Sequence, residues 1–205
     1  MSALAFSDEV TENSDVIGRL RQLARHGSMS WSEVHSIAER QAALLLDLWR
    51  VSEPPVPQFV IASLPGVFVD YRDDWPTSGM AVQARSHWQI VIRATERRWR
   101  QRFSLAHEFK HILDDPFFEC MSKHLPADQR QERAERLCNY FAACLLMPRP
   151  WVKHDWYGGM QNVRELARRY YVSTEAMTTR LSELGLTPMT LAIELGAGRH
   201  QRGAL

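Results

Sequence analysis

The chain has few cysteines, no long apolar run and almost no net charge, and each shortage excludes a class of protein. Three cysteines in 205 residues fit reduced thiols in a cytoplasm better than a disulfide framework. No early apolar run resembles a signal peptide, and none approaches the roughly 20 residues of a membrane span. A formal net charge of +1 indicates neither a strong polyanion binder nor an acidic tail. We therefore expect a cytoplasmic globular protein without a membrane partner.

The chain is long enough for one compact catalytic domain with helical extensions. Its cysteines are Cys120, Cys138 and Cys144, and their spacing matches no usual zinc site. Two of them fall on the apolar side of a helix expected after residue 126, which favours buried thiols over metal ligands.

A motif with its own chemistry stands at residues 107–111, which read His-Glu-Phe-Lys-His. Residues four apart share one face of a helix, so His107 and His111 would aim two imidazoles at one point. This is the H-E-x-x-H arrangement of zinc metallopeptidases, in which the glutamate, here Glu108, takes a proton from a metal-bound water. A third protein ligand would leave one position of Zn²⁺ open for that water.

The alternative for this motif is a polar helix face with two solvated histidines. The flanking sequence weighs against it, because apolar residues are interleaved at helical spacing: Phe103, Leu105, Ala106, Ile112 and Leu113. On such a half-buried helix, two histidines with a glutamate between them cost stability unless a metal ion compensates.

The third ligand should come from a second helix. Extending the first motif to the metzincin pattern fails, because Asp114 stands where glycine is needed and Phe117 where histidine is needed. A helix is predicted from Asp128, as N-cap with Gln131 at the capping-box position, to the helix-stopping Pro148.

Two glutamates of that helix are candidate ligands. Glu135 lies at the edge of the apolar stripe, and Asn139 follows one turn later, where an amide would support a metal-binding carboxylate. Glu132 is the competitor, one turn earlier. Both glutamates can also be read as ordinary solvated residues, as most glutamates are.

The N-terminal half predicts helices and a small sheet. Residues 15–49 read as helix, broken once, with Ser30 or Ser32 capping the second piece. Strands are expected at 80–84 and 89–93. By analogy with zincin folds, we expect strand 89–93 to be an edge strand that binds substrate in extended form, and an interior strand is the alternative.

Residues 162–185 read as helix, tight turn, helix, with Ser173 as an N-cap and Gly185 as a stop. This pattern resembles a DNA-reading helix-turn-helix. The second helix, however, offers one arginine, Arg180, beside Glu175, and the segment contains no lysine. We therefore expect the two helices to pack beside the catalytic core without binding DNA.

Two sequence blocks carry a family resemblance. Residues 102–111 read R-F-S-L-A-H-E-F-K-H, and residues 135–148 read E-R-L-C-N-Y-F-A-A-C-L-L-M-P. Together they resemble the ImmA/IrrE family of metallopeptidases, in a likeness that covers roughly residues 35–190. Two positions depart from the family pattern, because Lys110 stands where glycine is usual and Cys138 where alanine is common. We expect Lys110 to point away from the metal.

The resemblance implies that His107, His111 and Glu135 are the zinc ligands and that Glu108 is the catalytic base. It also implies an α+β fold, with a zincin-like metalloprotease core in which a small, mostly antiparallel sheet packs on helices. We divide the chain into a flexible N-terminus at 1–14, a zincin-like metallopeptidase domain at 15–157 and a C-terminal, helix-turn-helix-like extension at 158–205.

We expect a zinc-dependent endopeptidase whose substrate, by the resemblance, is a phage or mobile-element repressor, an antitoxin or a stress-response repressor. His154, Tyr157 and Tyr140 are candidates for the donor that stabilises the oxyanion. One alternative is a non-catalytic, DNA- or partner-binding transcriptional regulator that keeps the zincin fold. Another is a toxin–antitoxin or phage module that acts by binding alone. The intact ligand set and Glu108 weigh against both alternatives.

Overall fold

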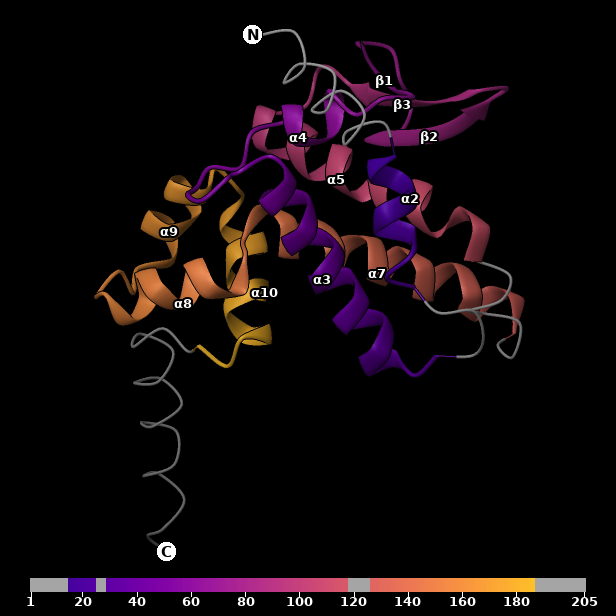
Figure 1. The fold of residues 1–205 in the computed structure, drawn as a ribbon. Coiled ribbons are helices and arrows are strands. Elements are labelled where there is room, and N and C mark those ends of the chain that lie inside the picture. The colour runs from indigo at the N-terminus through magenta and orange to yellow at the C-terminus, as the bar shows by residue number, and fades with distance from the viewer. Residues whose placement is uncertain (1–14, 25–28, 118–125, 187–205) are drawn as a thin grey trace, which may run out of the picture.

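The computed structural model describes residues 15–24, 29–117 and 126–186, as helices around one small sheet (Figure 1). In chain order the elements are α2 (Val16–Arg21), α3 (Trp31–Leu48), α4 (Phe59–Ala62), β1 (Val67–Arg72), β2 (Gly79–Ala84), β3 (His87–Arg93), α5 (Arg98–Asp114), the 3-10 turn η1 (Asp115–Phe117), α7 (Ala127–Leu146), α8 (Arg149–Tyr157), α9 (Val163–Tyr170) and α10 (Thr174–Glu183). The predicted α+β class is confirmed. Cys120 and the N-terminal segment 1–14 lie outside the described residues.

The sheet has three strands in the order β1-β3-β2. β3 pairs with β1 in parallel and with β2 in antiparallel orientation, so the sheet is mixed. The prediction that residues 89–93 form an edge strand is therefore wrong, because β1 covers the side of β3 that β2 leaves free. Within the described residues, β2 and β1 are the edges.

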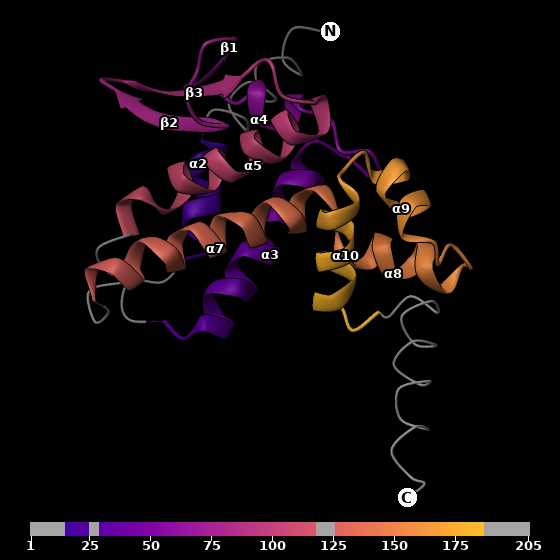
Figure 2. The same ribbon diagram turned by 180° about the vertical axis from the view of Figure 1, so that it is seen from behind.

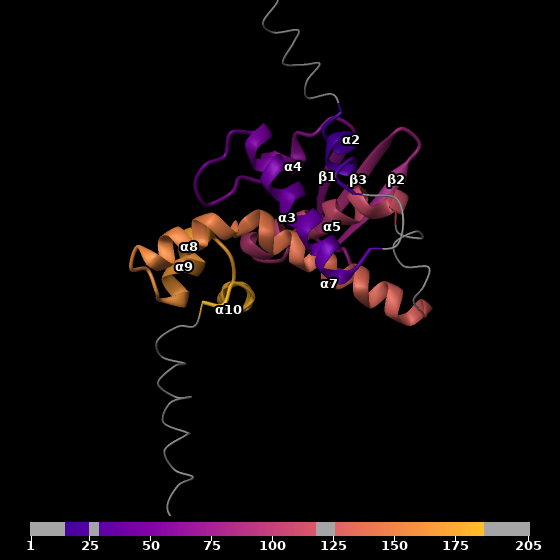
Figure 3. The same ribbon diagram turned by 60° about the horizontal axis from the view of Figure 1, so that its bottom comes forward.

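The sheet lies on one side of α5, while α7 and α3 lie on the other (Figures 1 and 2). Ile90 and Ile92 of β3 are fully buried, as are Phe109 of α5 and Phe141 of α7. Seen from below, α3 lies across α7 (Figure 3). The core therefore runs through α5, which has apolar neighbours on both sides.

Local sequence decides where α3 begins. Ser30 is the N-cap, and its hydroxyl accepts a hydrogen bond from the backbone N–H of Glu33 at 3.3 Å. The Glu33 carboxylate in turn accepts from the Ser30 backbone N–H at 2.8 Å, which completes a capping box. Of the two serines that the sequence offered as caps, Ser30 is the one used.

Prolines set both ends of α7. Pro126 is the N-cap and no side chain caps the helix, so Asp128 is not the N-cap that we predicted but a residue of the first turn. A proline ring fixes φ near the helical value, which allows a helix to start without a side-chain cap. At the other end, Met147 leaves the helical region with φ −133°, because the following Pro148 disfavours helical backbone before it.

Two buried arginines attach the C-terminal helices to the rest of the chain. Arg102 of α5 donates to the carbonyl oxygens of Tyr170 at 3.2 Å and Val56 at 2.6 Å. Arg180 of α10 donates through Nε to the carbonyl of Met147 at 3.1 Å. The structure thus packs α9 and α10 against the helices that carry the zinc motifs, as Figure 2 shows for α10 beside α7. No helix in the described part of the chain is long and apolar enough to cross a membrane.

Candidate metal centre

Three polar side chains from two helices meet between α5 and α7. His107 and His111 are one turn apart on α5, and their Nε2 atoms are 3.2 Å apart. Glu135 of α7 places Oε2 at 3.2 Å from His107 Nε2 and Oε1 at 3.4 Å from His111 Nε2. The three side chains that the sequence analysis named as ligands therefore lie together.

Asn139 lies one turn after Glu135 and contacts a histidine. Its Oδ1 is 3.0 Å from Nδ1 of His107. An amide oxygen only accepts, so this contact requires the proton on Nδ1 and leaves the Nε2 lone pair facing Glu135 and His111. Burial lowers the pKa of His107, and the neighbouring His111 lowers it further. The sequence predicted that Asn139 would support the Glu135 carboxylate, whereas in the structure its amide oxygen contacts His107.

These donors fit a zinc ion. A tetrahedral ion with bonds of about 2.0–2.2 Å needs ligand atoms about 3.3–3.6 Å apart. The distances among His107, His111 and Glu135 are 3.2, 3.2 and 3.4 Å, close to that spacing. A neutral imidazole lone pair and a carboxylate are also the donors that Zn²⁺ accepts in proteins. A bound cation would satisfy the Nε2 lone pair of His107 and the Glu135 carboxylate together.

Cys138 is a second candidate for the third ligand. Its thiol and the ring nitrogens of His107 and His111 all lie within 4.8 Å of one another. The side chain is buried, and burial raises the pKa of its thiol well above the usual value, whereas a ligand must be the thiolate. Glu135 has carboxylate oxygens 3.2 and 3.4 Å from the two histidines and stays partly exposed, so an ionised carboxylate costs less here than a buried thiolate. Glu132 is exposed on α7.

Glu108 faces the edge strand β2. Burial raises its pKa to about 7, the nearby Glu135 carboxylate adds to this rise, and a hydrogen bond from the backbone N–H of Ala81 opposes it. Gly79, at the start of β2, approaches so closely that a Cβ added there would be 2.9 Å from Glu108 Cγ. The carboxyl group is therefore held between α5 and the backbone of β2.

A cavity of about 270 Å³ opens beside these groups, and we call it the metal cleft. Its walls include Ser78 and Arg100 as well as His107, Glu108 and Glu135. Arg100 has its Nε 3.8 Å from Glu96 Oε2, and its Nη2 donates to Ser78 Oγ at 3.4 Å. Sequence reasoning missed Arg100, although it stands two residues before the Arg-Phe that begins the first block.

The three oxyanion candidates from the sequence do not line this cleft. His154 is exposed on α8, and Tyr157 on the same helix is 75% exposed. The Tyr140 hydroxyl donates to Glu39 at 2.6 Å. Arg100 and Ser78 line the cleft and are among its residues whose side chains carry donors suited to an oxyanion.

Lys110, the central departure from the family pattern in the first block, points into the core. It is 1% exposed, and its Nζ donates to Asp114 at 2.6 Å and to Gln41 at 2.9 Å. The ammonium group also lies 5.8 Å from the centre of the Phe141 ring. Lys110 thus points away from the two histidines, as the helix spacing predicts, and its charge is compensated on the far side of α5.

The chain is similar to known proteins in sequence. The family model described as the IrrE N-terminal-like domain, Peptidase M78, matches residues 61–182. The radiation response metalloprotease IrrE of Deinococcus deserti is 34% identical over 113 residues, which are 52% of this chain and 40% of that protein. The protein of the same name from Deinococcus radiodurans is 29% identical over 141 residues, or 65% of this chain and 42% of that protein. The chain thus spans about two fifths of the length of these relatives.

A solved structure shares the fold. A transcriptional regulator from Mycobacterium tuberculosis superposes with a TM-score of 0.59 at 17% sequence identity. The match covers 82% of this chain and 51% of the regulator. At that identity the likeness shows the architecture alone.

Proposed function

Because this chain belongs to the Peptidase M78 family of IrrE N-terminal-like domains, we propose that it is a zinc-dependent endopeptidase. The observation that carries the proposal is the meeting of His107, His111 and Glu135 beside a half-buried Glu108. A helical pair that only stabilised the fold would not need two histidines, a carboxylate and a second, separately held glutamate around one cleft.

His107, His111 and Glu135 would hold the metal, with Asn139 fixing the orientation of the His107 ring. Zinc in such a site supplies a Lewis acid that acidifies water and polarises a carbonyl group. The protein supplies the ring orientation, the spacing of the donors and a cleft wide enough to admit a peptide beside them.

Glu108 is the general base. Its carboxylate takes a proton from the attacking water and gives it to the leaving amine, which requires a pKa near the working pH. Burial raises the pKa of Glu108 to about 7, a value suited to both steps. The contacts with Gly79 and Ala81 restrict the carboxylate to one side of the cleft.

The substrate backbone would lie along β2. This strand is a sheet edge within the described part of the chain, and its residues Gly79 and Ala81 touch the proposed base. An extended peptide can add to a free strand edge through main-chain hydrogen bonds. Arg100 lines the same cleft and is the donor that we assign to the developing oxyanion.

The substrate class follows from the family. The relatives are named radiation response metalloproteases, which supports a regulatory protein as substrate, such as a stress-response repressor, a phage repressor or an antitoxin. Cleavage of a repressor would release transcription. The family match crosses residue 157, so we also infer that the helices after it work as part of the catalytic unit.

Co-expression with a repressor-like protein encoded beside this chain tests the proposal. We expect the wild type to cleave that protein and Glu108→Ala to leave it intact, while both variants carry zinc. Equal cleavage by Glu108→Ala would disprove the mechanism. Absence of zinc from the purified wild type would favour a non-catalytic regulator that keeps the fold.

A further inference from the structure

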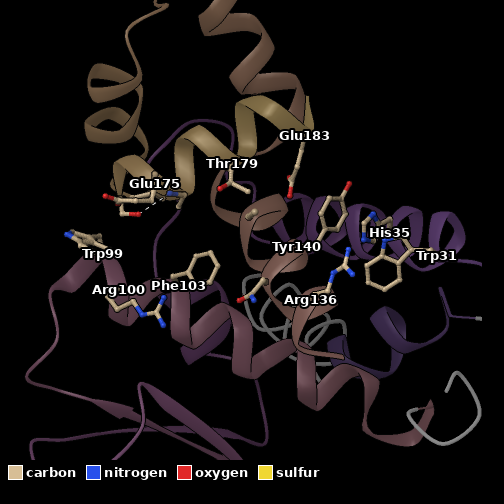
Figure 4. A pocket seen from close by; sticks show the side chains of 15 residues that line it. Trp31, His35, Trp99, Arg100, Phe103, Arg136, Tyr140, Glu175, Thr179 and Glu183 are labelled. Carbon is tan, nitrogen blue, oxygen red and sulfur yellow. Dashed lines mark hydrogen bonds between the residues drawn. The ribbon is translucent and has the colours of Figure 1, made fainter. Parts of the chain in front are cut away.

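A second cavity, of about 470 Å³, lies between α10 and the helices that carry the zinc motifs (Figure 4). We call it the α10 groove. Arg100, Phe103 and Asn139 line both this groove and the metal cleft. The metal cleft and the α10 groove are therefore neighbouring cavities that share part of their walls.

The walls of the α10 groove are unusually aromatic. Trp99 and Phe103 of α5 stand at one end, and Trp31, His35 and Tyr140 stand at the other (Figure 4). The rings of His35 and Tyr140 are stacked, with centroids 3.9 Å apart and planes 9° from parallel. Stacked rings form a firm apolar wall, and such walls favour large flat or aliphatic side chains.

Small residues leave the space between these walls. Ala143 of α7 and Ala176 of α10 line the groove, so its volume depends on short side chains on both helices. Thr179 also lines it from α10, one turn after Glu175 and one turn before Glu183 (Figure 4). One face of α10 therefore lines one side of the groove.

The charges around the groove indicate a peptide and not a nucleic acid. Arg100 and Arg136 line it from α5 and α7, and Glu175 and Glu183 line it from α10. A phosphate backbone in the groove would meet both glutamates, whereas a peptide carries a neutral backbone and side chains of either sign. The guanidinium of Arg136 lies 5.3 Å from the Trp31 ring centre, so part of the basic charge is already engaged by the wall.

We infer that the α10 groove is the specificity pocket for a bulky aromatic or long aliphatic side chain of the substrate, next to the scissile peptide. This inference rests on the proposed peptidase function. It gives α10, the helix that corresponds to the reading helix of a helix-turn-helix, a role in selecting a peptide. Thr179 lines the groove from α10 between Glu175 and Glu183, so a larger side chain there would occupy the pocket.

The test compares two neighbouring threonines of α10. Thr179→Trp fills the groove, while Thr178→Trp adds the same ring at an exposed position that does not line it. Short blocked peptides carry Phe, Leu, Ala or Asp at each position around a cleavable bond, and kcat/KM is measured by mass spectrometry. We expect wild type and Thr178→Trp to prefer Phe or Leu over Ala about 10-fold to 100-fold at one position. Thr179→Trp should lose that preference and still cleave the Ala peptides.

A binding measurement separates failure of this inference from failure of the peptidase proposal. The indole NMR signals of Trp31 and Trp99, assigned with Trp→Phe variants, should shift when the Phe peptide is added. The signal of Trp156, which is buried in α8, should not move. If the protein cleaves no peptide but these signals shift, the peptidase proposal fails, while the binding of a peptide side chain in the α10 groove is supported. Uniform cleavage of all peptides, an identical profile in Thr179→Trp, or no shift at Trp31 and Trp99 would overturn the inference.

Discussion

Gly79 of β2 lies directly against Glu108 of α5, although β2 forms its backbone ladder with β3. A Cβ at position 79 would be 2.9 Å from Glu108 Cγ, 3.0 Å from its Oε1 and 3.2 Å from Ile92 Cδ1. Real Cβ atoms essentially never approach other atoms below 3.0 Å, so any side chain there must displace the glutamate. The absence of a side chain at Gly79 therefore helps to place the proposed base.

Gly79→Ala should lower kcat/KM by up to about 100-fold, because a displacement of about 1 Å in a catalytic group can cost that much. Zinc content should not change, since Gly79 contacts none of the proposed ligands. Met80→Ala is the matched control, as Met80 is the next residue of β2 and its side chain is exposed. Unchanged kinetics in Gly79→Ala would show that Glu108 does not need this close approach.

Glu108→Gln should keep the metal and lose proteolysis. The amide has nearly the same shape as the carboxylate but cannot accept the proton, and a general base of this kind contributes about 10²–10⁴-fold. Zinc per chain is measured by elemental analysis, and cleavage is measured with a verified substrate. Retained cleavage would remove Glu108 from the mechanism.

Zinc content should depend on Glu135 and not on Glu132. We expect about one zinc per chain in the wild type, and loss of zinc in His107→Ala and Glu135→Ala. Glu132→Ala is the control, because Glu132 is exposed one turn earlier on the same helix. Cys138→Ser tests the competing ligand, since its thiol also lies within 4.8 Å of the histidine nitrogens. Loss of zinc in Cys138→Ser with full zinc in Glu135→Ala would reverse the assignment.

Lys110→Met should destabilise the fold by about 3–5 kcal/mol, because it leaves the Asp114 carboxylate without its buried cation. Lys110 Nζ is 2.6 Å from Asp114 Oδ1, and the two side chains are 1% and 13% exposed. Urea unfolding measures the change. The double variant Lys110→Met with Asp114→Leu should recover much of the loss, since no charge then remains unpaired. A single variant as stable as the wild type would show that the ion pair contributes nothing.

The C-terminal helices should not bind DNA with sequence specificity. Arg180, the arginine of the helix corresponding to a reading helix, is 1% exposed and pairs with Glu183 at 3.0 Å. It cannot reach a base without leaving the core, so exposed Thr178 is the better position for a test. Binding to the region upstream of its own gene is measured at two salt concentrations. Nanomolar, sequence-specific binding lost in Thr178→Ala would contradict the prediction, whereas weak binding that salt removes would agree with it.

Most features that depend on contacts within one helical turn could be predicted from the sequence. The spacing of His107 and His111 places both rings on one side of α5 because the helix repeats every 3.6 residues. Ser30 and Ser173 cap helices because their hydroxyls accept from backbone N–H groups within the same turn. Gly185 follows α10 with φ +69°, which a glycine adopts without strain. The wrong cap at Asp128 has a local cause too, since Pro126 starts the helix two residues earlier.

The sequence by itself determined the two motif helices, the chemistry of their polar residues and the family to which they belong. Only the tertiary structure decided that β3 is the central strand, that Gly79 touches Glu108 and that Arg100 lines the metal cleft. It also decided that α10 and α5 enclose a groove beside that cleft. The physical reason is the same in each case. These contacts join segments far apart in the chain, and periodicity reports which face of an element is apolar but not which other element covers it.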